Sequence, residues 1–458
     1  MGNDITKQGV LFKGLTKKVL VARFDQELAS SDGGAILLKA CDERLGLSAA
    51  MAACLHDSRQ QSKIQHSYGE MFQQRMFGIA CGYADGNDAA RLADDPVFKL
   101  LAGRDPVTGS ALASQPTLSR FENAVSSGEL LRMSEALAAS VIQRHRRRKR
   151  KVRRITIDLD PTEDPTHGGQ QLSFFNRLYD HWCYLPVAGF LSFDNEPDQY
   201  LFCCVLRGGH AVAKTGCLSI LKRLLPRLRK AFPKATLRIR LDAGFAGAEL
   251  YEFFEAEGLE YVVCMGKNPV LLRFAEPLMA PLRAALEAGE DIIPRFGECR
   301  YAAHSWKKHE RRVIIKADIA LHPGRRPKDN PRFIVTNLKT TPKFIYRKVY
   351  CLRGDIENRI KELKHGLQID RTSCTSFKAN QLRVLMTAAA YVLMQELRLK
   401  ARHTGCARAQ VNTLRLRLLK LGVWIESSVR RIVLHLPTST PYADDWRRIA
   451  ISVGAVPT

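Results

Sequence analysis

The chain has 458 residues, 45% of them hydrophobic, which suits a packed globular protein and excludes one that is disordered throughout. Its 71 Lys and Arg against 46 Asp and Glu give a net charge of +25, an excess that favours a polyanionic partner. Charge alone leaves DNA, RNA and a merely basic surface as alternatives. No apolar run reaches the roughly 20 residues of a membrane-spanning helix, and the first residues lack a secretory signal pattern. We therefore expect a soluble, intracellular protein.

The twelve cysteines are scattered along the chain, and no two of them form a CxxC pair. Most stand among apolar residues, where a free thiol behaves as a small core side chain. We expect reduced thiols, with neither a disulfide framework nor a zinc finger.

Residues 1–143 are predicted to form a helical N-terminal domain. Apolar residues recur at helical spacing, for example over 70–83, and turns rich in Gly and Asp separate such stretches. The segment 115–125 favours a helix with Arg120 on its exposed face. That helix fits a DNA-reading element and an ordinary surface helix about equally well.

A strongly basic run follows over residues 144–154, where nine of eleven positions are Arg or Lys. Such a run is usually a solvated, flexible stretch, but this one directly precedes an apolar strand. We interpret it as a linker between domains that follows a phosphate backbone. The DNA contacts predicted within it are Arg146, Arg147, Arg148, Lys149, Arg150 and Lys151.

Beyond the basic run the pattern changes to strands alternating with helices. Three predicted strands are followed by a helix, a strand, a helix and a strand, over 154–160, 181–193, 200–209, 212–232, 236–242, 246–258 and 259–266. The order β-β-β-α-β-α-β is that of an RNase H-like fold, so we predict an α/β domain formed by 155–268 and 350–400. The segment 269–349, with Pro, Gly and short apolar strands, predicts a β-rich insertion. A helical stretch resumes near 353, and 401–458 forms a C-terminal region.

Three carboxylates are predicted to meet at one edge of the sheet. Asp160 and Asp242 each end a predicted strand, and Glu357 lies on the helix after the insertion. Taken singly, such residues are usually turn caps or surface ion pairs. Together they offer the hard oxygen ligands that two divalent ions about 4 Å apart need for phosphoryl transfer. Asp158 lies on the same strand face as Asp160, so either residue fits the first position.

The helix after the insertion has a specific spacing of functional groups. Tyr350, Arg353, Glu357 and Lys364 follow the pattern Y-x2-R-x3-E-x6-K. On a helix, Arg353 then lies one turn before Glu357, and Lys364 lies two turns after it. One helix face thus offers an acid between two cations, which suits a metal ligand flanked by phosphate-binding groups.

This spacing is similar to the Y-R-E-K signature of bacterial insertion-sequence DDE transposases. Segments along nearly the whole chain resemble one branch of that group: SDGGAILL (31–38), CLHDSR (54–59), RMFGIACGY (75–83), QPTLSRFENA (115–124), DLDPTEDPTHGGQ (158–170), LDAGF (241–245), FIVTNL (333–338), GDIENRIKELK (354–364) and DRTSC (370–374). The resemblance implies an RNase H-like catalytic domain whose β-strand insertion separates the second Asp from the Glu. It also implies a DNA transposase that cleaves the ends of its insertion sequence and joins them to target DNA.

The resemblance implies metal-holding roles for Asp160, Asp242 and Glu357, with two Mg²⁺ ions, or Mn²⁺, as cofactors. In the family a Thr or similar residue stands two positions after the first acid, and Thr162 favours Asp160 over Asp158. Tyr350, Arg353 and Lys364 are implied as DNA contacts.

The partners implied are double-stranded DNA, both terminal inverted repeats and target, and a second copy of the chain in a homodimer. We expect a cytoplasmic, nucleoid-associated protein whose residues 1–143 recognise the element's ends. Two other classes stay open. A different RNase H-like nuclease would need the same acids but not the Y-R-E-K spacing, and a non-enzymatic DNA-binding descendant would not need all three acids.

Overall fold

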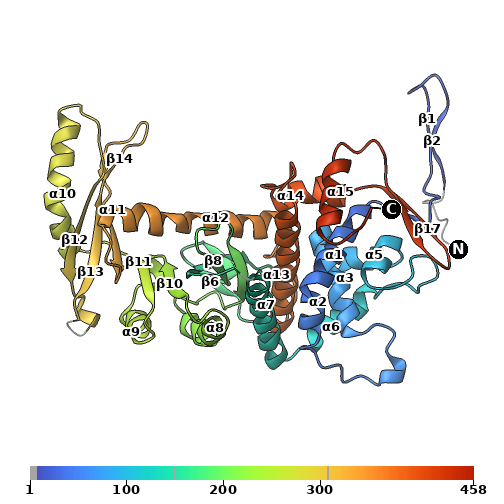
Figure 1. The fold of residues 1–458 in the computed structure, drawn as a ribbon, viewed down its shortest axis with the longest axis horizontal. Coiled ribbons are helices and arrows are strands. Elements are labelled where there is room, and N and C mark those ends of the chain that lie inside the picture. The colour runs from blue at the N-terminus through green and yellow to red at the C-terminus, as the bar shows by residue number, and fades with distance from the viewer. Residues whose placement is uncertain (1–7, 149, 307–308, 458) are drawn as a thin grey trace.

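The protein is described here by a computed structural model that covers residues 8–148, 150–306 and 309–457. The molecule is elongated, with a large sheet and its helices in one half and the N-terminal helices in the other (Figure 1). No helix in these ranges is both long enough and apolar enough to cross a membrane.

A mixed sheet of eight strands forms the larger half, in the order β12-β13-β16-β11-β10-β4-β8-β9. Strands β4, β10 and β11 are parallel to one another, and all other neighbours are antiparallel. The arrangement is consistent with an RNase H-like domain. The strands are β4 (Arg154–Pro161), β8 (Val187–Phe193), β9 (Tyr200–Val205), β10 (Thr236–Leu241), β11 (Glu260–Met265), β12 (Arg295–Tyr301), β13 (Arg311–Ala317) and β16 (Arg332–Thr336).

The segment between β11 and the Glu357 helix extends this same sheet, because β16 pairs with β11 and β13 pairs with β16 and β12. It also contains a helix, α10 (Pro269–Glu287), that the sequence analysis did not predict. Pro277 and Pro281 lie inside α10, and proline is a poor interior helix residue, so the pattern favoured an irregular segment. A short pair, β14 (Ile319–Ala320) and β15 (Lys328–Asp329), completes the segment.

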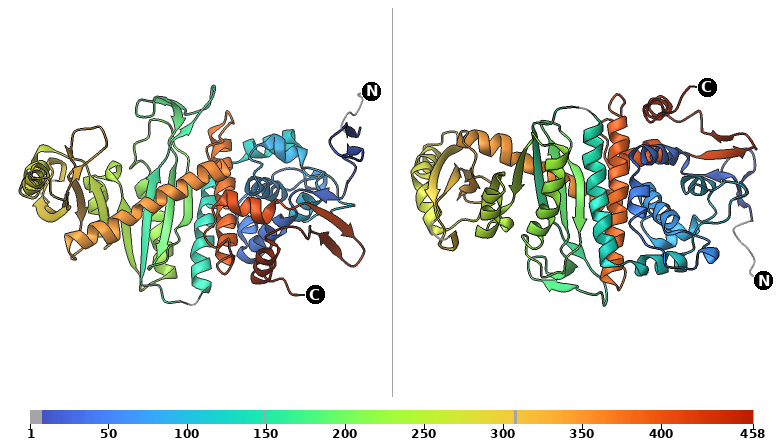
Figure 2. Two further views of the ribbon diagram at one scale, coloured as in Figure 1. Left: turned by 90° about the horizontal axis from the view of Figure 1, so that it is seen from above. Right: turned by 60° about the horizontal axis from the view of Figure 1, so that its bottom comes forward.

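The two faces of the sheet are covered by different helices. One face packs on α8 (Cys217–Ala231), α9 (Ala248–Ala256) and α10 through a shared apolar core. The other face carries a continuous helical segment, which Figure 2 shows crossing the strands. That segment comprises α11 (Pro342–Phe344), a π-helical stretch (Ile345–Tyr350), a 3₁₀ turn (Cys351–Arg353), α12 (Gly354–Lys361) and a second π-helical stretch (Glu362–Gly366). It begins eleven residues before the predicted start near 353, with Pro342 in its first turn.

Two long helices lie side by side between the two halves, α7 (Ser127–Arg147) and α13 (Phe377–Lys400) (Figures 1 and 2). Helix α13 is buried along nearly its whole length. Helix α7 continues to Arg147, so the first residues of the predicted linker are helical. Buried Val141, Ile142 and His145 extend the packed face of α7 into the basic run. Lys149 lies outside the described residues.

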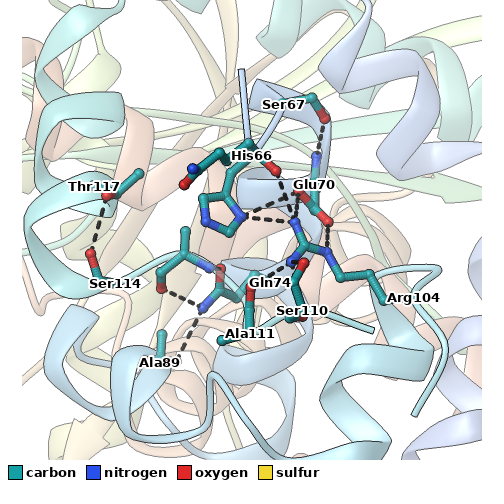
Figure 3. Close-up of polar contacts among 12 residues, drawn as sticks. His66, Ser67, Glu70, Gln74, Ala89, Arg104, Ser110, Ala111, Ser114 and Thr117 are labelled. Atoms are coloured by element: carbon teal, nitrogen blue, oxygen red, sulfur yellow. Dashed lines mark hydrogen bonds and ion pairs between the residues drawn. The ribbon is translucent and has the colours of Figure 1, made fainter. Parts of the chain in front are cut away.

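Residues 8–147 form helices and short strands that are joined by loops. Besides α7, the elements are β1 (Val10–Phe12), β2 (Leu20–Ala22), β3 (Ala29–Ser30), α1 (Ile36–Leu45), α2 (Leu47–Ala52), α3 (Tyr68–Cys81), α4 (Gly86–Arg91), α5 (Pro96–Leu101) and α6 (Gln115–Ala124). Figure 3 shows how Arg104 ties the loop after α5 to α3: its guanidinium pairs with Glu70, contacts His66 Nδ1 at 2.9 Å and donates to the Ser110 carbonyl at 2.9 Å.

The N-terminal helices share one hydrophobic core with α13 and with the C-terminal region. The C-terminal elements are α14 (Val411–Leu414), a π-helical stretch (Arg415–Leu419), β17 (Val423–Ser427), β18 (Ile432–His435) and α15 (Ala443–Ser452). Strand β3 pairs with β17. Gly34 packs so tightly that an added Cβ would lie 1.7 Å from the Leu418 carbonyl oxygen. Within the described residues, the N-terminal helices therefore do not have a core of their own.

A buried ion pair joins the sheet to the helical segment above it. Arg240 on β10 donates to both carboxylate oxygens of Asp158 on β4, at 2.7 and 2.8 Å. Its remaining terminal nitrogen donates to the Val349 carbonyl at 2.8 Å. Asp158 is fully buried and Arg240 is 4% exposed, so removing either partner leaves a buried charge without its counterion.

Asp158→Ala is accordingly expected to lower the free energy of unfolding by about 3–5 kcal/mol, measured by urea unfolding. Glu135→Ala is the control, because Glu135 pairs with Arg223 and Arg227 at the surface, where an ion pair contributes about 0–1 kcal/mol. An equal decrease in the two variants would contradict the structural role of the Asp158 pair.

Candidate active site at the sheet edge

Asp160 and Asp242 lie at the same edge of the sheet because their strands run parallel. In the register of β4 and β10, Asp158 is opposite Arg240. Asp160 and Asp242 each lie two residues further along these parallel strands, so they are at the same edge. Asp160 is 7% exposed. Asp242 follows β10 directly and its carboxylate accepts a hydrogen bond from the Gly244 N–H at 2.9 Å, which fixes the turn that leaves the strand.

Glu357 on α12 lies near this edge, and so does Arg353, which directly precedes α12. The Arg353 guanidinium lies 3.0 Å from Asp160 Oδ1 and 3.4 Å from Asp242 Oδ2. It lies 3.3 Å from Glu357 Oε1, one helical turn further along. The structure thus brings the three predicted acids together around a single cation.

The electrostatics of this cluster follow from burial and like charge. Burial raises the pKa of Asp160 to about 7; Arg353 opposes this rise, and the nearby Asp242 carboxylate adds to it. Burial would lower the pKa of Arg353, but Asp160 and Asp242 outweigh it and hold that pKa above its usual value. Arg353 therefore remains a cation, and it reduces the repulsion among the three carboxylates.

The donor set suits a hard divalent cation. All three side chains offer only carboxylate oxygens, the ligand type that Mg²⁺ and Mn²⁺ take in proteins. Within the described ranges, no three acidic, imidazole or thiol groups stand in a ready metal-binding arrangement.

Neighbouring acids lie outside the cluster. The carboxylate of Asp158 is bound by Arg240, as described above. Glu362 points to the opposite side of its helix, where it accepts hydrogen bonds from Arg398 at 2.7 Å and from the Val411 N–H at 2.9 Å. Asp355 is exposed. These positions agree with the helical geometry expected for acids two and five residues away from Glu357.

The other two residues of the Y-R-E-K spacing contact protein groups. Lys364 Nζ lies 3.5 Å from Glu163 Oε1 and 3.9 Å from Asp370 Oδ2. Tyr350 packs against Tyr346, with ring centroids 5.9 Å apart. Burial raises the pKa of the Tyr350 hydroxyl above its usual range.

Sequence reasoning missed residues that shape the surroundings of the acids. Buried Arg207 donates to four backbone carbonyls, those of Leu185, Val212, Ala213 and Thr215, at 2.7–3.1 Å. It thereby sets the path of the loop before α8, whose Ala213 lies against Gly244 beside Asp242. Backbone acceptors carry no residue signature, so no pattern in the sequence pointed to this role.

Asp164 was missed as well, although it lies within the turn-rich segment after Asp160. It begins the small sheet of β5 (Asp164–Pro165), β7 (His181–Tyr184) and β6 (Phe174–Asn176). Thr372 Oγ1 lies 2.9 and 3.0 Å from its two oxygens. Burial raises the pKa of Asp164 to about 8, an effect that the Thr372 hydrogen bond reduces.

The basic run lies at the opposite end of β4 from Asp160. Arg147 donates to the Arg44 carbonyl at 2.9 Å, and Arg148 donates to Glu196 at 2.7 Å. Arg146, Arg150 and Lys151 are exposed.

A mixed sheet that presents two aspartates at its edge, with a glutamate delivered by a crossing helix, defines a class of metal-dependent phosphoryl-transfer enzymes. The family described as "Transposase DDE domain group 1" matches residues 12–456, nearly the whole chain. The chain therefore belongs to the DDE transposases, which cleave and transfer DNA strands with divalent metal ions. A search of curated proteins gave no match.

The raised pKa of Asp164 predicts how the stability of the protein depends on pH. Because its folded pKa of about 8 exceeds the ordinary 3.8, the folded state holds the proton that the unfolded chain releases, and stability is lost as pH rises through this window. Asp164→Asn is expected to melt progressively higher than the wild type as pH rises from 3.8 to about 8. Asp355→Asn, at the surface, is the control. A constant melting difference across that range would contradict the assignment.

Proposed function

We propose that this transposase cleaves the ends of its insertion sequence and joins them to target DNA, with Asp160, Asp242 and Glu357 holding the metal ions. The convergence of these three acids on the Arg353 guanidinium is the observation that carries the proposal. Two Mg²⁺ ions, or Mn²⁺, would supply activation of the attacking oxygen and stabilisation of the leaving oxygen. The first position goes to Asp160, because the carboxylate of Asp158 is occupied by Arg240.

The chain's own cations would then act on the DNA. Arg353 pairs with the same carboxylates that would hold the metal ions, and its planar guanidinium would suit a bidentate contact to a phosphate at this edge. Lys364 and Tyr350 lie on the same helical segment and extend this DNA-facing surface. Asp160 is nearly buried, and this limits the access of bulk water to its carboxylate.

Recognition of the element's ends is proposed for the N-terminal helical region. It holds none of the three acids, and α6 presents exposed Arg120. Because this region shares its core with 401–458, its binding is a property of the full chain. We further propose that two copies of the chain hold the two ends as a homodimer.

The acids can be tested by charge removal that preserves shape. Asp160→Asn, Asp242→Asn and Glu357→Gln are each expected to lower cleavage of end-containing DNA by on the order of 10²–10³-fold or more, the scale of losing a preorganised catalytic group. DNA binding should persist or tighten, because repulsion between carboxylates and phosphates is relieved. Asp355→Asn is the control and should keep full activity. Cleavage that survives the Glu357 substitution, or that proceeds in a metal chelator, would refute the assignment.

The basic run can be tested through salt dependence. Each phosphate that the protein neutralises releases counterions, so the logarithm of the DNA affinity should fall steeply with the logarithm of the salt concentration. Replacing exposed Arg146, Arg150 and Lys151 by Gln should reduce that slope by about 0.9 for each phosphate that the run no longer neutralises. Fluorescence anisotropy over a salt series measures it. A variant with the wild-type slope would show that the run does not touch the backbone.

A further inference from the structure

An open pocket of about 1280 Å³ lies at the start of β4, far from the acids at its end. Among the described residues, nine Arg or Lys side chains and three carboxylates line it. They come from parts of the chain that are distant in sequence: the basic run, the β8–β9 turn (194–198), Arg359 on α12, the end of α13 and Arg408. The folded structure, and not the basic run alone, therefore brings these charged residues together.

The three carboxylates of the pocket do not neutralise it, because the nine cations outnumber them. Protein groups also engage each carboxylate. Asp194 accepts hydrogen bonds from the backbone N–H groups of Arg153 and Arg154, at 2.8 and 2.9 Å. Glu196 pairs with Arg148 at 2.7 Å. Although burial opposes it, His145, Tyr200 and Arg148 lower the pKa of Glu196 to about 2.

The remaining acid, Asp198, pairs with Arg402 at 3.0 Å. Exposed Lys151, Arg153 and Arg408 have no carboxylate within ion-pair distance in the described part of the chain. The pocket therefore presents an excess of exposed positive charge, and this calls for an anionic ligand.

The lining indicates which part of a nucleic acid the pocket takes. Its residues include no aromatic side chain, whereas sites for unpaired bases use aromatic rings as stacking platforms. Arg and Lys without such rings are suited to phosphate oxygens. The chemistry thus favours the backbone of a duplex over a single strand.

The position of the pocket separates it from the reacting bond. Arg154 and Asp160 lie on the same face of β4, because side chains alternate with period two. Six residues at about 3.3 Å each put them about 20 Å apart, roughly the length of six base pairs at about 3.4 Å per pair. On α12, Arg359 lies about 200° around the helix from Glu357. The helix therefore presents Glu357 to the catalytic acids and Arg359 to the pocket.

We propose that this pocket is a second DNA site, which holds the backbone of a duplex about six base pairs away from the phosphate at the catalytic acids. The inference rests on the proposed function, since it takes the acids as the point of reaction. It assigns DNA contacts to Arg402 and Arg408, which lie about 250 residues beyond the basic run.

The test compares two double variants of equal charge in the full-length protein. Arg402→Gln with Arg408→Gln removes two cations from the pocket, and Lys222→Gln with Lys230→Gln removes two exposed cations from α8, which covers the other face of the sheet. The pocket variant should lower the salt slope of duplex binding by about 1.8, at about 0.9 for each phosphate. The control should keep the wild-type slope. Asp198→Asn, which frees Arg402, should bind duplex more tightly than the wild type.

Varying the length of the duplex tests the distance between the pocket contact and the cleaved bond. If the pocket variant weakens binding only to duplexes that extend beyond about six base pairs from the cleaved bond, the pocket holds the same duplex. An equal effect on shorter duplexes would overturn the placement of this contact about six base pairs from the cleaved bond. Equal slopes for the pocket and control variants would overturn the proposal, as would an effect confined to single-stranded DNA. Strand cleavage by the variants of Asp160, Asp242 and Glu357 tests the proposed function separately, because those acids lie outside the pocket.

Discussion

Three neighbouring carboxylates repel one another unless positive charge lies among them, and in this chain Arg353 supplies that charge. Two unit charges of like sign about 4 Å apart repel by about 4 kcal/mol at the effective dielectric near a protein surface. Arg353 contacts all three acids and stands one helical turn from Glu357. The helix therefore carries both Glu357 and Arg353, the cation that reduces the repulsion between Glu357 and the two aspartates.

The position of that helix depends on buried ion pairs on either side of Arg353. Before it, Arg240 binds Asp158 and the Val349 carbonyl, which fixes the π-helical stretch against β4 and β10. After it, Glu362 binds Arg398 of α13 and the Val411 N–H. The sheet and α13 thus hold the helix independently. The acids lie together because two ion pairs outside the cluster fix the position of the helical segment that carries Glu357.

Much of the sheet and the location of the acids could be predicted because both have local signals. Alternating apolar residues mark β4 and β10, and the acid at the end of each strand falls at the shared edge of parallel neighbours. The partner of Asp158 could not be predicted, since pairing it with Arg240 requires the register of strands that are distant in the chain. Helix α10 was missed because its prolines outweighed its apolar face. The common core of residues 1–143 and 401–458 was missed for the same reason as the ion pair: hydrophobic periodicity shows that a face is buried, not what covers it.

That common core has a consequence for how the chain is made. Strand β3 finds its partner β17 only after roughly 400 further residues have been synthesised, roughly 20–80 s later at about 5–20 residues per second. Until then the groove beside Gly34 has no Leu418 to fill it, and Asp32 lacks Lys420, its ion-pair partner at 2.8 Å. A ribosome that stops before β17 releases N-terminal helices with an open apolar face. A chain that is truncated before β17 is therefore expected to be an aggregation-prone fragment and not an independently folded N-terminal module.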